Sequence, residues 1–168
     1  MQGKKNIVLI GMPGAGKSTV GVVLAKRLGY RFLDSDLVIQ EQTKKLLHEL
    51  ITEHGVDGFL KIEEDINAGL DCEQAVIATG GSVIYGEKAM EHLRKIGCVV
   101  YLKLSYKEIE DRLGDLTARG VALKNGQTLK DLYNERCPLY EKYAHIVQEC
   151  DRKRVREIVQ ELASQANA

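Results

Sequence analysis

A short stretch near the start of the chain combines glycines with a lysine–serine pair. It reads Gly-Met-Pro-Gly-Ala-Gly-Lys-Ser from Gly11 to Ser18 and fits the pattern G-x-x-x-x-G-K-[ST] at every position. Glycines let the backbone of such a loop aim its N–H groups at phosphate oxygens, and the helix that follows adds the positive end of its dipole. In this pattern Lys17 reaches the β- and γ-phosphates, and the Ser18 hydroxyl binds Mg²⁺. The stretch therefore predicts a nucleoside-triphosphate site.

The alternative is an ordinary glycine-rich turn between a strand and a helix. A turn accounts for the glycines but not for a Lys-Ser pair at the start of a helix, so we favour the phosphate site. The residues expected to hold the nucleotide are Gly11, Gly14, Ala15, Gly16, Lys17, Ser18 and Thr19.

Strand and helix patterns alternate along the chain. Continuous apolar runs predict buried strands, and apolar residues at helical spacing predict the helices between them. Ser105 with Glu108, and Thr128 with Asp131, are helix-capping signals, and Pro138 marks a kink or break. Strands are expected at 5–10, 31–34, 75–79, 98–104 and 145–148, and helices at 17–29, 36–54, 56–70, 87–96, 105–113, 128–143 and 151–163.

This alternation predicts an α/β fold, a three-layer α/β/α sandwich around a five-stranded parallel sheet. Ligands bind at the carboxyl ends of the strands in such sheets. We therefore expect three loops of unusual composition to meet there, namely Gly11–Ser18, Asp34–Asp36 and Gly80–Ser82. The stretch Gly114–Gln127 is polar, contains three glycines and lacks periodicity, which predicts a mobile loop.

Size and composition indicate one domain spanning residues 1–168. Lysines and arginines number 24 and so do aspartates and glutamates, so net charge favours neither a nucleic-acid nor a membrane partner. No signal peptide or membrane-length apolar run is recognisable. The four cysteines form no C-x-x-C pair, as is typical of reduced thiols. We expect a cytoplasmic monomer.

Several motifs in a consistent order resemble the shikimate kinase family, in the nucleoside-monophosphate-kinase branch of P-loop folds. The resemblance covers nearly the whole chain. It rests on GMPGAGKST (Gly11–Thr19), FLDSD (Phe32–Asp36), the F-x-x-I-E-E segment (Phe59–Glu64), TGGSV (Thr79–Val83), Arg119 in a glycine-flanked loop and ERCPLY (Glu135–Tyr140).

The resemblance implies an enzyme that uses ATP and Mg²⁺ to phosphorylate a hydroxyl group of a small molecule, shikimate. On the donor side, it implies that Asp34 supports Mg²⁺ through water beside Ser18, and that Arg112 lies against the adenine. Arg119 would lie on a lid, about residues 114–127, that closes over the phosphates. Phosphoryl transfer needs such cations around the developing negative charge.

On the acceptor side, helices of about residues 36–70 would bind the substrate. The resemblance implies that Asp36 holds the acceptor hydroxyl and assists its deprotonation, with Lys17 and Arg119 as the other catalytic residues. Gly80 and Gly81 would present backbone N–H groups, and Arg136 would hold the carboxylate. Glu63 either orients a group of the acceptor site or is a solvated helical carboxylate. Arg136 also has an alternative, that of an exposed arginine on a helix.

Two positions depart from the family pattern. The family normally has an arginine after the phenylalanine of the F-x-x-I-E-E segment, where it grips the shikimate carboxylate, but here that residue is Leu60. Thr79 replaces the first glycine of a triplet. A charge-assisted pair is worth about 1.5–3 kcal/mol, and Lys61 points about 100° away from position 60 on an ideal helix. These departures leave open a kinase for another polyol, hydroxy acid or hydroxy amino acid. A non-catalytic nucleotide-binding regulator is a further alternative, although such a protein has no use for Asp36.

Overall fold

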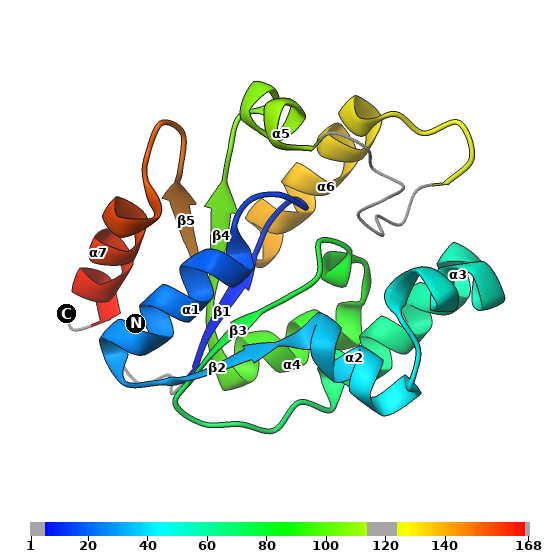
Figure 1. Cartoon of the computed structure of the whole chain (residues 1–168), viewed down its shortest axis with the longest axis horizontal. Coiled ribbons are helices and arrows are strands. Elements are labelled where there is room, and N and C mark those ends of the chain that lie inside the picture. Colours follow the sequence, from blue (N-terminus) through cyan, green and yellow to red (C-terminus); the bar gives the residue numbers. More distant parts are fainter. Residues whose placement is uncertain (1–5, 114–123, 167–168) are drawn as a thin grey trace.

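The computed structural model describes residues 6–113 and 124–166. These residues form a five-stranded sheet of order β2-β3-β1-β4-β5 in which every adjacent pair is parallel (Figure 1). The strands are β1 (Asn6–Ile10), β2 (Arg31–Asp34), β3 (Ala75–Ala78), β4 (Gly97–Lys103) and β5 (Ile146–Glu149). The predicted α/β class and five-stranded parallel sheet are confirmed.

Helices cover both faces of this sheet. The pair α1 and α7 packs together on one face, and α4 and α6 contact β4 from the other (Figure 1). None of the helices in the described part of the chain is long and apolar enough to cross a membrane. The helices are α1 (Lys17–Leu28), α2 (Ser35–Thr43), α3 (Leu47–Ala68), the 3₁₀ turn η1 (Val83–Tyr85), α4 (Glu87–Ile96), α5 (Tyr106–Arg112), α6 (Leu129–Tyr143) and α7 (Val155–Ala166).

The central strand β1 explains why the functional loops share one edge of the sheet. All of its residues are buried, as expected for a strand covered on both faces. In the register, Leu9 pairs with Ala78 of β3, and Asp34 at the end of β2 pairs with the same Ala78. Because these parallel strands end side by side, the chain leaves all three at the same edge.

Local signals position several of the helices as predicted. Gly29, in the left-handed conformation with φ 70°, ends α1, and its N–H donates to the Ala25 carbonyl. Ser105 accepts from the Glu108 N–H at the start of α5, and Thr128 forms a reciprocal capping box with Asp131 at the start of α6. The sequence predicted a kink or break at Pro138. The helix α6 instead continues through Pro138 without a break.

The region 36–54 differs from the single helix predicted there. The helix α2 ends at Thr43, because Lys44 adopts the left-handed conformation with φ 58°. The helix α3 starts at Leu47, and its first turn is stabilised by the Leu46 N–H, which donates to the Glu49 carboxylate. The break predicted at Gly55 is present within α3, where φ is 72° and ψ is 177°.

The start of the last helix also differs from the prediction. The helix α7 begins at Val155 rather than near Asp151. Asp151 instead lies in a turn, where its carboxylate accepts from the Ser105 N–H at 2.8 Å. The next residue, Arg152, has a left-handed backbone conformation with φ 58°, which a right-handed helix cannot include, so α7 starts after it.

Candidate active site

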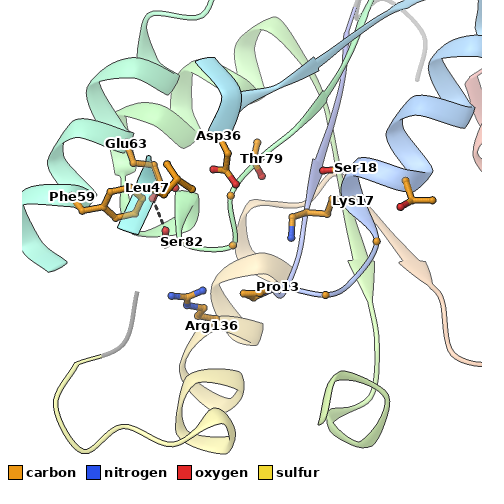
Figure 2. A pocket seen from close by; sticks show the side chains of 15 residues that line it. Pro13, Lys17, Ser18, Asp36, Leu47, Phe59, Glu63, Thr79, Ser82 and Arg136 are labelled. Carbon is orange, nitrogen blue, oxygen red and sulfur yellow. Dashed lines mark hydrogen bonds between the residues drawn. The ribbon is translucent and has the colours of Figure 1, made fainter. Parts of the chain in front are cut away.

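A cavity of about 290 Å³ lies where β1, β2 and β3 end. Residues from all three of the loops predicted to converge line it, together with residues of α3 and α6 (Figure 2). The predicted convergence is therefore confirmed. The lining residues are Pro13, Gly14, Gly16, Lys17, Ser18, Thr19, Asp36, Leu47, Phe59, Glu63, Thr79, Gly80, Gly81, Ser82 and Arg136.

The loop between β1 and α1 forms one wall of this cavity. Gly14 and Gly16 have φ of 79° and 86°, values that side chains disfavour, so the tight course of the loop depends on glycine. Gly16 immediately precedes α1 and has no side chain that could cap the helix. The N–H groups of the first turn of α1 therefore form the kind of helix N-terminus that binds phosphate.

Lys17 is held inside this loop. Its ammonium donates to the carbonyl oxygens of Gly11 and Met12, each at 2.8 Å, and the side chain is buried. Burial lowers the pKa of Lys17 to about 8, although the nearby Asp36 carboxylate opposes this change. A bound phosphate would supply the negative charge that this buried ammonium requires.

Ser18 and Asp34 form a hydroxyl–carboxylate pair beside the loop. The Ser18 hydroxyl donates to Oδ2 of Asp34 at 3.0 Å, and Oδ1 of Asp34 accepts from the Asp36 N–H at 2.9 Å and thereby caps α2. Hydroxyl and carboxylate oxygens are ligands that Mg²⁺ prefers, with water and phosphate oxygens completing its shell. The described residues contain no cluster of three or more His, Cys, Asp or Glu side chains that could hold a metal without such help. The donor set at Ser18 and Asp34 fits Mg²⁺ bound to a nucleotide.

Two carboxyl groups meet at Gly80. A Cβ atom on Gly80 would lie 2.7 Å from Oε2 of Glu63 and 2.8 Å from Oδ1 of Asp36, so the close approach of both side chains depends on glycine. Burial and the neighbouring Asp34 raise the pKa of Asp36 to about 6. Burial also raises the pKa of Glu63 to about 7, although the Ser82 hydroxyl, which donates to Glu63 at 2.7 Å, opposes this. Asp36 is thus a carboxylate near neutral pH with an affinity for protons above that of an ordinary aspartate.

Arg136 points into the same cavity from α6 (Figure 2). It is 1% exposed, so the alternative of an exposed helical arginine is wrong. Its guanidinium lies over the Tyr85 ring, 5.4 Å from the centroid. One turn later, the Tyr140 hydroxyl donates to the Gly81 carbonyl at 2.5 Å and ties α6 to the loop after β3. A buried guanidinium in a polar cavity can bind an anionic group of a ligand.

The predicted site residues divide into groups by position. Asp36, Glu63, Gly80, Gly81 and Arg136 lie together with Gly14, Gly16 and residues 17–19 around the cavity. Gly11 and Ala15 belong to the loop between β1 and α1 but do not line the cavity. Arg112 does not line the cavity but contacts the loop, since its Nη1 donates to the Gly14 carbonyl at 3.3 Å. Arg119, and with it most of the expected lid, lies outside the described residues.

Five further residues line the cavity without a role predicted for them. Thr79 and Ser82 belong to the TGGSV motif, and Phe59 opens the F-x-x-I-E-E segment, so their motifs were the available signal. Thr79 is buried, and its hydroxyl donates to the Leu9 carbonyl at 2.8 Å, which fixes the end of β3 against β1. Pro13 and Leu47 carry no chemical signal of their own.

Position 60 lies beside the cavity rather than in it. Leu60 packs in a small apolar cluster around Ile39, Leu50 and Phe59. Lys61 forms ion pairs with Asp65 at 3.0 Å and with Glu64 at 3.7 Å on the exposed side of α3. The expectation that Lys61 does not replace the missing arginine is therefore supported by its position.

The phosphate-binding loop ahead of α1, at the carboxyl edge of an all-parallel sheet, places the chain among the P-loop nucleotide-binding proteins. Comparison with known proteins identifies the branch. A family model described as "Shikimate kinase" matches residues 13–167. The chain belongs to the shikimate kinase family, whose members are ATP-dependent phosphotransferases.

Individual relatives agree with this assignment. A protein named shikimate kinase from Clostridium botulinum (strain Eklund 17B / Type B) is 39% identical over 145 residues, which cover 84% of this chain and 86% of the relative. One from Paracidovorax citrulli is 38% identical, with 95% of this chain and 91% of the relative covered. The solved structure of shikimate kinase from Acinetobacter baumannii in complex with shikimate superposes with a TM-score of 0.88 at 32% identity, covering 99% of this chain and 94% of that one.

Proposed function

We propose that this protein transfers the γ-phosphoryl group of ATP to a hydroxyl group of shikimate, forming shikimate 3-phosphate and ADP. The observation that carries the proposal is the single cavity that joins Lys17, Asp36 and Arg136. It offers a phosphate site, a proton acceptor and an anion-binding cation in one cavity. The likeness to a shikimate kinase that holds shikimate supports the same acceptor here.

On the donor side, the N–H groups of residues 14–19 and the Lys17 ammonium would bind the β- and γ-phosphates. Ser18 would bind Mg²⁺ directly, and Asp34 would hold it through water, because the two side chains already contact each other at 3.0 Å. The metal supplies positive charge to the phosphate oxygens when bound. Arg112, which donates to the Gly14 carbonyl at 3.3 Å, would lie against the adenine. The role expected for Arg119 stays a prediction.

On the acceptor side, Asp36 would accept a hydrogen bond from the acceptor hydroxyl and take its proton as the oxygen attacks. The new bond forms between that oxygen and the γ-phosphorus, while the bond from the γ-phosphorus to the β–γ bridging oxygen breaks and ADP leaves with its electrons. Arg136 would bind the shikimate carboxylate. Glu63 and the N–H groups of Gly80 and Gly81 would hold the remaining hydroxyl groups.

We also propose that the enzyme works as a monomer in the cytoplasm. All four cysteines, Cys72, Cys98, Cys137 and Cys150, carry free thiols, as is usual for proteins of a reducing compartment. Size-exclusion chromatography with light scattering tests the oligomeric state.

The test of the proposed function is a coupled assay of ADP release with ATP, Mg²⁺ and shikimate. We expect release of ADP that depends on shikimate, with a product whose phosphorus resonance is that of a phosphate monoester. The assay is repeated with a panel of other polyols, hydroxy acids and hydroxy amino acids. Absence of stimulation by shikimate would overturn the proposed acceptor, and stimulation by a member of the panel would then name the true one.

A further inference from the structure

A second, smaller cavity lies next to the acceptor end of the site. Its volume is about 30 Å³, which is room for one or two water molecules or for an oxygen of a ligand. Arg136 lines both this cavity and the larger one, so the two are neighbours across its side chain. The residues that line the small cavity are Val56, Leu60, Tyr85, Lys124, Gln127, Glu135 and Arg136.

The charged groups around this small cavity are Lys124, Arg136 and Glu135. Both carboxylate oxygens of Glu135 already accept hydrogen bonds, Oε1 from the Tyr85 hydroxyl at 2.5 Å and Oε2 from Nε2 of Gln127 at 3.1 Å. The two cations, Lys124 and Arg136, outnumber the one carboxylate, Glu135, so the small cavity carries an excess of positive charge. That excess suits a carboxylate group entering from the acceptor site.

A chain of contacts holds the backbone of Lys124 near the start of α6, the helix that carries Arg136. Residues 124–127 form a turn in which the Gln127 N–H donates to the Lys124 carbonyl at 3.1 Å. The Gln127 side chain then bonds to Glu135, the residue that precedes Arg136 on α6. Tyr85 binds Glu135 with its hydroxyl and carries the Arg136 guanidinium over its ring. Lys124 is thus attached to the same group of residues that positions Arg136.

The other lysines near the site have different neighbours. The Lys17 ammonium bonds to carbonyls of the phosphate loop. Lys61 pairs with Asp65 and Glu64 on the outer side of α3. Lys124 itself shares its cavity with Leu60, whose apolar side chain can pack along the methylene stem of a lysine while the ammonium reaches past it.

We propose that Lys124 is a specificity-determining residue: with Arg136, it binds the carboxylate of the acceptor, and Leu60 and Val56 form the apolar wall along which its stem lies. The inference rests on the proposed function, because it presumes an acceptor with a carboxylate. A lysine ammonium is a compact charge on a flexible stem and needs no planar partner, so it can serve from a turn rather than from a helix.

The experiment compares Lys124→Gln with the wild type and with a control, Lys130→Gln, whose ammonium lies over the Tyr106 ring at 5.9 Å. We expect Lys124→Gln to raise the KM for shikimate about tenfold, the effect of losing a charge-assisted contact, with the KM for ATP unchanged. Shikimate methyl ester, which lacks the negative charge, should show the same KM in both proteins. Adding Leu60→Arg to Lys124→Gln should restore the low KM for shikimate.

The outcomes separate the two proposals. Turnover of shikimate with an unchanged KM in Lys124→Gln overturns the role of Lys124 and leaves the proposed function intact. An equal rise in KM for shikimate and for its methyl ester also overturns that role, because it shows an effect unrelated to the carboxylate. A wild-type enzyme that does not phosphorylate shikimate at all overturns both proposals.

Discussion

At the scale of single residues, the acceptor end of the cavity carries more buried charge than a stable fold requires. Asp36 and Glu63 approach the same glycine, Gly80, and Lys17 and Arg136 are buried beside them. Taking such groups out of water is costly, and the raised pKa values of both carboxyl groups express that cost. Phosphate and hydroxyl groups of ligands can interact with these charged groups, so the arrangement is suited to binding rather than to stability.

Glu63 gives a direct test of this cost. Its pKa rises from 4.5 to about 7 on folding, so the folded protein binds its proton more tightly than the unfolded chain does. Its contribution to stability is therefore full below about pH 4.5 and is lost as the pH rises through about 7. Glu63→Gln should remove this dependence and, above pH 7, raise the free energy of unfolding by up to about 3 kcal/mol. Urea unfolding from pH 5 to 8 measures it. A wild type and variant whose stabilities run parallel over that range would contradict the assignment.

Some site residues could be predicted and others could not, for physical reasons. Lys17, Ser18 and Asp36 lie in the first turns of helices that follow strands, in motifs whose composition fits phosphate chemistry, so the sequence indicates them. Leu47 lines the cavity because the chain bends at residues 44 and 45, between α2 and α3. Lys124 and Leu60 line the same small cavity because the Gln127 side chain contacts Glu135 of α6. Such tertiary contacts have no periodic signal in a sequence.

At the scale of elements, α3 carries Phe59 and Glu63 to the cavity from one side of a break at Gly55. Packing of this helix against α2 and α4 then determines where the acceptor side chains lie. The break also determines the direction of the first turns of α3, which bring Leu47 to the same cavity. The geometry of Gly55 therefore matters for the site as well as for the helix.

Gly55→Ala tests the break. With φ at 72° and ψ at 177°, Gly55 occupies a region closed to side chains, although a Cβ there would meet no atom of the described structure within 4 Å. The cost is therefore one of backbone strain, and we expect a loss of about 1–3 kcal/mol in the free energy of unfolding. Gly69→Ala is the matched control, because Gly69 has a negative φ and ordinary contact distances. The chain lacks tryptophan, so far-UV circular dichroism in urea is the readout. Equal stability of the two variants would contradict this reading of Gly55.

The ends of helices and strands were predictable where the sequence contains capping residues or glycines. Gly29, Ser105 and Thr128 end or begin helices as expected, and each apolar run corresponds to a strand. The end of α2 was missed because Lys44, not a glycine, adopts the left-handed conformation there. Nothing in the composition of residues 36–54 separates one helix from two.

At the scale of the whole molecule, the parallel sheet explains how distant segments form one site. The loops after β1, β2 and β3 start at the same edge, and α6 reaches that edge from the far end of the sequence. The donor and the acceptor must then approach each other inside one cavity, which is what phosphoryl transfer needs. Fold and family could be predicted from the sequence because ordered motifs occur along nearly all of it.

The central claim is a division of labour in which Lys17 serves the nucleotide and Asp36 serves the alcohol. Replacing Asp36 by asparagine keeps the shape and removes the proton acceptor, whereas Lys17→Ala removes a phosphate contact and should weaken both ATP binding and turnover. The most direct test measures ATP affinity and kcat with shikimate for Asp36→Asn beside the wild type. We predict ATP affinity close to that of the wild type and a kcat lower by about two to four powers of ten. A loss of ATP affinity as large as that caused by Lys17→Ala, or an unchanged kcat, would contradict the account.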